Sequence, residues 1–156
     1  MTITTDQQFN RYSIAYFDFS KAEEFAKEAE SHPRNSIVFE ALLFAAIVCY
    51  CRPFSPNEKD SSAPAESRLI IEKIVELSTE ERTLHNHCIT LRNKALAHSE
   101  FTFNPTRLNQ ESRVVGSRPF SLLSSPFDLN GLLGLLEKLI RACHLQRGNY
   151  SLRREP

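Results

Sequence analysis

The sequence predicts an all-α fold, an up-and-down bundle of four to five helices forming a single domain over residues 1–156. Three observations predict it. Apolar side chains recur three and four residues apart in long stretches, which is the period of an amphipathic helix. Serine, asparagine, proline and aspartate stand where these stretches begin, as they do at helix starts. A chain of 156 residues has the length of one domain, and it can bury about two-thirds of its unfolded surface.

The first helix is predicted from a periodic set of aromatic residues and alanines. The alternative is that the aromatic half forms a separate short element, because neighbouring aromatic residues blur the pattern there. Charged side chains fill the other faces after Ser20. The periodic residues are Phe9, Tyr12, Tyr16, Phe19, Ala22, Ala26 and Ala29.

The second helix is predicted from about Ser36 to Cys51, with Asn35 as its cap. It is apolar on every side, which is typical of a helix surrounded by others or buried in a dimer. Glu40 is its one charge, and a charge without a partner is costly to bury. The position near the helix start favours contact with solvent over a role as the partner of an arginine.

The middle of the chain predicts a loop, a short helix and a capped helix. Residues 52–65 contain three prolines and a cluster of charges, so we expect an exposed loop. A short helix over residues 66–77 follows. Ser78 and Glu81 have the spacing of a capping box, so the next helix begins there and runs to His98.

The last helix has a clear start after an irregular region over residues 99–125, in which Val114 and Val115 are an option for a brief extended piece. Ser125, Pro126 and Asp128 follow the order of cap, first position and acidic first turn. The tail over residues 148–156 is polar and expected to fray. The helix has one apolar face, made of Leu129, Leu132, Leu133, Leu136, Leu139, Ile140 and Cys143.

The apolar surface of the second and last helices exceeds what one small bundle needs to bury. This excess favours a homodimer, in which a second copy covers the remainder.

Charge and cysteine content limit the classes of function. Nineteen basic and nineteen acidic residues cancel, so the whole molecule has no general attraction to nucleic acid. Residues 101–156 carry eight bases, mostly arginine, against four acids, and these arginines form either a phosphate-facing patch or ordinary solvated surface. The four cysteines lie among apolar residues and are predicted to be reduced core thiols. No familiar ligand spacing predicts a metal site, and no cofactor is expected.

The sequence also bears on the compartment. Nothing at the N-terminus resembles a signal peptide. The longest apolar run, Ala41 to Cys51, is shorter than the roughly 20 residues that span a bilayer. We therefore expect a cytoplasmic protein without a membrane partner.

The strongest candidate site lies in the segment LRNKALAHSE, residues 91–100. Arginine is a fixed cation suited to phosphate, and histidine can take and give a proton near neutral pH. On a regular helix, His98 continues the core-facing stripe and Arg92 lies on the neighbouring stripe, so both can border one cleft. The pattern alone is loose, because Arg82 and His87 have a similar spacing at the start of the same helix.

This segment resembles the signature of HEPN domains, helical domains of prokaryotic defence and toxin systems. In that family an arginine, usually followed by a polar residue, precedes a histidine by four to six positions at a helix end. Arg92, Asn93 and His98 match residue by residue, and the order of elements is similar over about residues 5–147. A toxin subgroup has tyrosine two positions after the histidine. Glu100 stands there in this chain, so tyrosine nucleotidylation is not implied.

The resemblance implies a metal-independent endoribonuclease in which the motifs of two subunits line one cleft. His98 would act as general base or acid for attack of a ribose 2′-OH on the adjacent phosphorus. Arg92 would hold the phosphate and stabilise its added charge, and Asn93 would orient one of these groups. The implied products are a 2′,3′-cyclic phosphate and a 5′-OH, with single-stranded RNA as the expected substrate. An antitoxin or another regulatory protein is a possible partner.

A second interpretation is a non-catalytic HEPN-like module. In it, the same residues bind a nucleotide, RNA or a partner protein, or they brace a dimer. The zero net charge favours this interpretation, because affinity for RNA comes largely from neutralising phosphates.

Overall fold

The computed structural model describes residues 5–56, 68–96, 106–108, 115–117, 120–124 and 126–152. Within these ranges the chain is mainly helical, which confirms the predicted all-α class. The four α-helices are α1 (Thr5–Glu30), α2 (Ile37–Cys51), α3 (Thr79–Thr90) and α4 (Leu129–Leu152). A π-helical turn, η3 (Leu91–Leu96), continues α3, and single 3₁₀ turns are η1 (Arg52–Phe54), η2 (Ile71–Lys73) and η4 (Leu122–Ser124).

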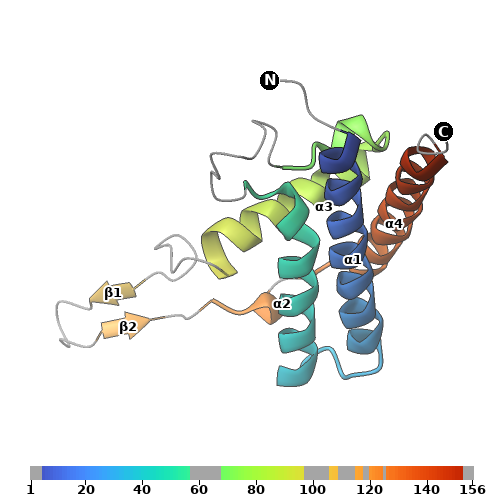
Figure 1. Cartoon of the computed structure of the whole chain (residues 1–156). Helices are drawn as coiled ribbons and strands as arrows, with labels where there is room; N and C mark the ends of the chain where they lie inside the picture. Colours follow the sequence, from blue (N-terminus) through green and yellow to red (C-terminus); the bar gives the residue numbers. More distant parts are fainter. Residues whose placement is uncertain are drawn as a thin grey trace.

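The helix α1 is the centre of the bundle. It packs against α2 on one side and α4 on the other, and α3 crosses the others obliquely (Figure 1). A short antiparallel hairpin adds strand β1 (Thr106–Leu108) paired with β2 (Val115–Ser117), in a register that places Arg107 opposite Gly116. The hairpin extends away from the helices in Figure 1. Val115 thus belongs to an extended segment, as the sequence allowed.

The core lies along the periodic face of α1. Phe19 and the small residues Ala15, Ala22, Ala26 and Ala29 are fully buried, and side chains of this size allow neighbouring helices to approach closely. The helix is continuous from Thr5 to Glu30, so the aromatic half is not a separate element. Both neighbours fill the space with larger side chains: Phe39, Leu43, Ile47 and Tyr50 from α2, and Leu129, Leu132, Leu135, Leu136, Leu139 and Cys143 from α4.

Side-chain caps fix where the helices start. The hydroxyl of Ser36 accepts a hydrogen bond from the Phe39 N–H, so Ser36 and not Asn35 caps α2. The predicted capping box of Ser78 and Glu81 is confirmed, with both reciprocal bonds present. The cap of α4 is Asp128, whose Oδ1 accepts from the Gly131 N–H at 2.8 Å. The expected start at Ser125 is therefore too early, and α4 begins at Leu129.

Three other predicted boundaries differ from the structure. Arg52–Phe54 is a 3₁₀ turn with Pro53 buried, so the predicted exposed loop does not start at residue 52. The short helix predicted over residues 66–77 is reduced to η2, where Ile71 is buried. The predicted frayed tail begins too early, since α4 continues through Gly148 to Leu152. Residues 57–67 and 153–156 lie outside the described part.

The cysteines are free thiols, as predicted, with Cys49 half-buried and Cys51, Cys88 and Cys143 buried. Burial raises the pKa of Cys51 and of Cys143 to about 12 in each case. Both thiols are therefore protonated near neutral pH and act as small apolar side chains.

The segment Ile37–Phe54, with a mean hydropathy of 1.8, is long and apolar enough to cross a membrane by length and composition alone. This is weak support for a span, because the core helix of a folded domain passes the same test. In this structure 44% of the segment is buried inside the protein.

Candidate functional site

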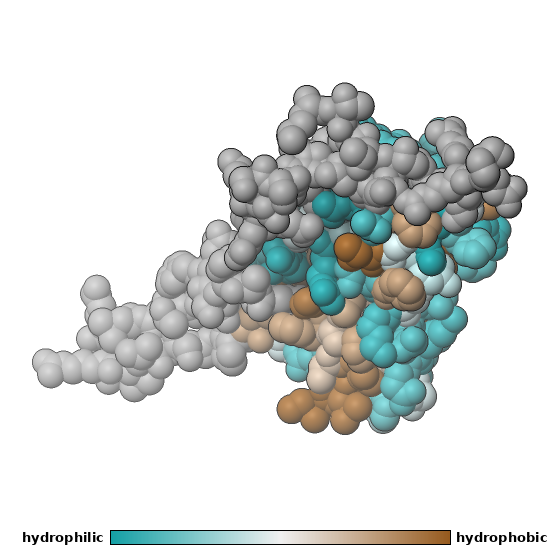
Figure 2. Space-filling view, viewed as in Figure 1, coloured by the Kyte–Doolittle hydropathy of each residue, from teal (hydrophilic) through white to brown (hydrophobic). Residues whose placement is uncertain are grey.

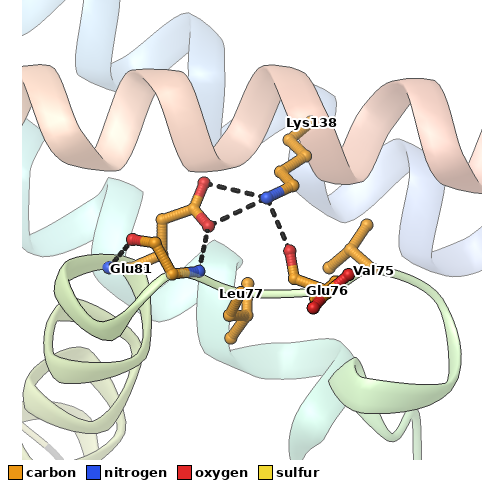
Figure 3. Close-up of a pocket in the computed structure, with 6 residues that line it drawn as sticks. Val75, Glu76, Leu77, Glu81 and Lys138 are labelled. Carbon is orange, nitrogen blue, oxygen red and sulfur yellow. Dashed lines mark hydrogen bonds and ion pairs between the residues drawn. The ribbon is translucent and has the colours of Figure 1, made fainter.

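The helix α3, which leads into the η3 turn with Arg92, is anchored at its start by Lys138 of α4. The Lys138 ammonium donates to the Glu76 carbonyl at 2.6 Å and to both carboxylate oxygens of Glu81 at 2.8 and 3.1 Å. Figure 3 shows the lysine pointing from α4 into the open hollow between these acceptors. Three donor hydrogens meet three acceptors, and Glu81 also closes the capping box with Ser78. The polar groups of this hollow therefore bind one another and join α3 to α4.

The middle of α3 is joined to α2 by a polar contact inside an aromatic cluster. The Tyr50 phenol and the His85 Nδ1 are 2.8 Å apart. The His85 ring also lies edge-to-face against Phe54, with ring centroids 4.8 Å apart. Burial lowers the pKa of His85. The charge of Glu72 partly offsets this shift, and the charge of Arg82 adds to it. Tyr50 and His85 are 35 residues apart in the chain, so no local pattern of the sequence predicts this contact.

The predicted site residues Arg92 and Asn93 are brought together on the π-helical turn η3. The Arg92 Nη1 donates to the Asn93 Oδ1 at 2.8 Å. Leu91 is buried beneath them, Arg92 is half-buried and Asn93 is exposed. The Arg92 charge is close enough to Cys51 to oppose the rise that burial causes in the pKa of that thiol. Arg92 therefore lies at the edge of the core with its guanidinium supported by an amide.

The π-helical turn changes the geometry expected for the motif. The sequence predicts one regular helix to His98, but α3 ends at Thr90 and the next six residues are π-helical. Hydrogen bonds from i to i+5 place more residues in each turn, so the stripes of a regular helix do not extend beyond Leu91. Such turns are rare and are frequent at functional sites. His98, the third predicted residue, lies outside the described residues.

The competing pair, Arg82 and His87, is not assembled into a site. Arg82 donates to the Glu72 carboxylate at 2.7 Å, so its positive charge already has a partner. His87 lies beside the Phe127 ring, with centroids 6.0 Å apart, and it is about 140° around the helix from Arg82. Among the described residues, Arg92 forms no ion pair with a carboxylate. In the part of the chain that the structure describes, Arg82 is therefore paired with a carboxylate and Arg92 is not.

Glu40 has a role that neither sequence alternative anticipated. Its Oε1 accepts from the Ser121 hydroxyl at 2.6 Å and from the Leu122 N–H at 2.8 Å. The carboxylate neither points freely into solvent nor pairs with an arginine among the described residues. It holds η4 against α2. The lone charge in an apolar helix indicated that Glu40 needs a partner. Its partner Ser121 is 81 residues away, so no local pattern identifies it.

The arginines of residues 101–156 that have described side chains do not form a patch for phosphate. Arg141 pairs with Glu137 at 3.0 Å within α4. Arg147 lies over the Tyr16 ring, 4.7 Å from its centroid. The other arginines of this region have side chains outside the described part, so the patch interpretation stays a prediction for them.

In comparisons with known proteins, no family model matches the chain, and neither a curated protein nor a solved structure matches it.

Proposed function

We propose that this protein is a HEPN-like, metal-independent endoribonuclease of a defence or toxin type, acting at a dimer cleft in the cytoplasm. Arg92, Asn93 and His98 are the proposed site residues. The observation that carries the proposal is the Arg92–Asn93 hydrogen bond of 2.8 Å on the π-helical turn. It presents a guanidinium with no carboxylate partner among the described residues, next to the segment that contains the histidine.

The chemistry assigned to each residue follows from its side chain. Arg92 binds the phosphate that is cleaved and stabilises the negative charge that develops on it. Asn93 fixes the guanidinium by accepting a hydrogen bond from it, which reduces the conformational freedom that Arg92 loses on binding. His98 removes the proton of the ribose 2′-OH or returns one to the leaving 5′-oxygen. The O–P bond to the next nucleotide breaks as the 2′-oxygen attacks.

A second copy of the chain is the proposed partner, and the outward face of α2 supports it. Six apolar residues lie within about 120° of arc on this face. Ile37 is 81% exposed and Phe44 is 41% exposed, which is unusual for side chains of this size on one contiguous face. Figure 2 shows a hydrophobic area at the N-terminal end of α2. We define the α2 face by Ile37, Val38, Ala41, Phe44, Ala45 and Val48.

The second candidate function is a non-catalytic HEPN-like module that binds a nucleotide, RNA or a partner protein such as an antitoxin. The zero net charge favours it, since strong RNA binding generally needs a basic face. In this case Arg92 and Asn93 still bind phosphate, but His98 has no role in proton transfer.

Product analysis tests the proposal and separates the two candidates. Purified protein is incubated with single-stranded RNA in EDTA, and the ends of the fragments are identified. The proposal expects a 2′,3′-cyclic phosphate and a 5′-OH. RNA that is bound but left intact supports the non-catalytic module, and 5′-phosphate ends contradict the assigned attack by the 2′-OH.

A further inference from the structure

A cavity unrelated to the Lys138 junction lies between the start of α2 and the segment that precedes α4. Its volume is about 240 Å³. The floor is apolar, with Phe39, Leu43 and Leu122 all buried. The rim adds Leu123 and Phe127, both half-buried, together with the polar Arg34 and Ser124. An apolar floor with a few polar groups at the rim is the composition of small-ligand sites, and this volume, below their usual range of about 300–1,000 Å³, suits one part of a ligand.

The walls of this cavity are held in place by hydrogen bonds already described. Glu40 fixes Ser121 and Leu122 to α2, so the η4 wall stands at a set position relative to Phe39. Asp128 caps α4 immediately after Phe127. The carboxylates of Glu40 and Asp128 thus accept hydrogen bonds from other groups, and neither forms an ion pair with Arg34.

Arg34 gives the cavity its charge. It is exposed, and its guanidinium lies 5.8 Å from the centroid of the Phe39 ring. It makes no ion pair with any carboxylate in the described part of the chain. The ring of Phe127 lies beside His87 of α3, with centroids 6.0 Å apart.

We propose that this cavity binds one nucleotide unit, with the base held against the half-buried Leu123 and Phe127 and a phosphate on Arg34. A planar base has faces that stack on aromatic side chains and edges that hydrogen-bond, for which the Ser124 hydroxyl is placed at the rim. The forked guanidinium matches a phosphate in two hydrogen bonds.

The cavity and the Arg92 turn both belong to segments that pack on α2, because η3 and η4 each contact that helix. The version in which the nucleotide unit is part of an RNA strand rests on the proposed ribonuclease function. The version in which it is a free mononucleotide does not. The same contacts serve both, and the experiment distinguishes them.

The test is an NMR titration of the full-length protein with uridine and adenosine monophosphate, inorganic phosphate and 3-phenylpropionate. The mononucleotides are expected to shift the amide signals of Arg34, Phe39 and the η4 segment. Arg34→Ala should weaken their binding at least tenfold, and Leu123→Trp, which fills the cavity, should abolish it. Arg141→Ala serves as the control, since it removes an exposed arginine of α4 and should leave binding unchanged. Thermal unfolding confirms that each variant is folded.

A short single-stranded RNA then identifies the source of the nucleotide. If Arg34→Ala weakens RNA binding as well, the unit belongs to a strand; if only the mononucleotide is affected, the ligand is free. Shifts that avoid the cavity, or binding of phenylpropionate as tight as that of the mononucleotides, would overturn the proposal. RNA cleavage dependent on Arg92 without nucleotide binding here refutes this inference alone. Nucleotide binding here without RNA cleavage refutes only the ribonuclease function.

Discussion

The Tyr50 hydroxyl and the His85 imidazole, 2.8 Å apart, form the polar link between α2 and the helix that carries Arg92. Tyr50 is fully buried, and a buried phenol hydroxyl needs a hydrogen-bond partner. His85 provides it while packing against Phe54. Together with the Lys138 junction at the start of α3, this link fixes the position from which the π-helical turn departs.

The first prediction concerns pH. The pKa of His85 is lowered in the folded protein, mainly by burial, so the unfolded chain binds the proton more tightly. Stability from this residue is complete above the unfolded pKa of about 6.5 and is lost as the pH falls from there through the lower folded value. His85→Gln, which keeps an acceptor for Tyr50 but cannot titrate, should remove this dependence from urea unfolding curves. His87→Gln, at an exposed site of α3, should keep it. If both variants lost the pH dependence equally, its assignment to His85 would be contradicted.

The second prediction concerns Glu40. Removing its carboxylate leaves the Leu122 N–H and the Ser121 hydroxyl without their acceptor. Glu40→Ala should lower the free energy of unfolding by about 1–3 kcal/mol, the cost of leaving a buried donor without its partner. Glu137→Ala is the control, since this exposed carboxylate pairs with Arg141 within α4, and exposed pairs contribute about 0–1 kcal/mol. Similar losses in the two variants would refute the role of Glu40.

The third prediction concerns the capping box. The Ser78 hydroxyl accepts from the Glu81 N–H at 3.2 Å, and loss of such a cap typically costs about 0.5–2 kcal/mol. Ser78→Ala should destabilise the protein by this amount in chemical unfolding. Thr90→Ala, at an exposed position at the other end of α3, should have a smaller effect. A Ser78→Ala variant as stable as the wild type would show that the anchor of α3 lies elsewhere.

The fourth prediction concerns the dimer. If a second copy covers the α2 face, Phe44→Glu places a charge in the interface and should convert the dimer to a monomer in sedimentation. Leu145→Glu offers a matched control, because Leu145 is equally apolar and 62% exposed but belongs to α4. That variant should remain dimeric. A wild-type protein that is monomeric at all concentrations would contradict this interface.

The sequence predicted those parts of the fold that depend on local periodicity. The stripe from Tyr12 to Ala29 places α1 correctly, and the spacing of Ser78 and Glu81 places the start of α3. Contacts between distant residues were not predictable in this way. The link from Glu40 to Leu122 joins residues 82 apart, and no local pattern contains it. The start of α4 was misplaced because Ser125 and Asp128 are both good caps, and local propensity does not choose between them.

The structure describes two of the three predicted site residues. The motif named Arg92 and Asn93, and the structure joins them by a hydrogen bond. A hydrophobic pattern with a period of 3.6 residues assumes a regular helix, so the π-helical turn was missed. The cavity beside Arg34 was missed for another reason. Its residues come from three separate segments, and none of them forms a motif by itself.

Cleavage of single-stranded RNA in EDTA, compared among four proteins, is the most direct test of the proposed function. The wild type and Arg82→Ala, whose arginine pairs with Glu72, should cleave at similar rates. Arg92→Ala and His98→Ala should each lower the rate by about a hundredfold or more, the scale on which charge stabilisation and proton transfer act. No cleavage by the wild type, or cleavage unchanged in His98→Ala, would contradict the proposal.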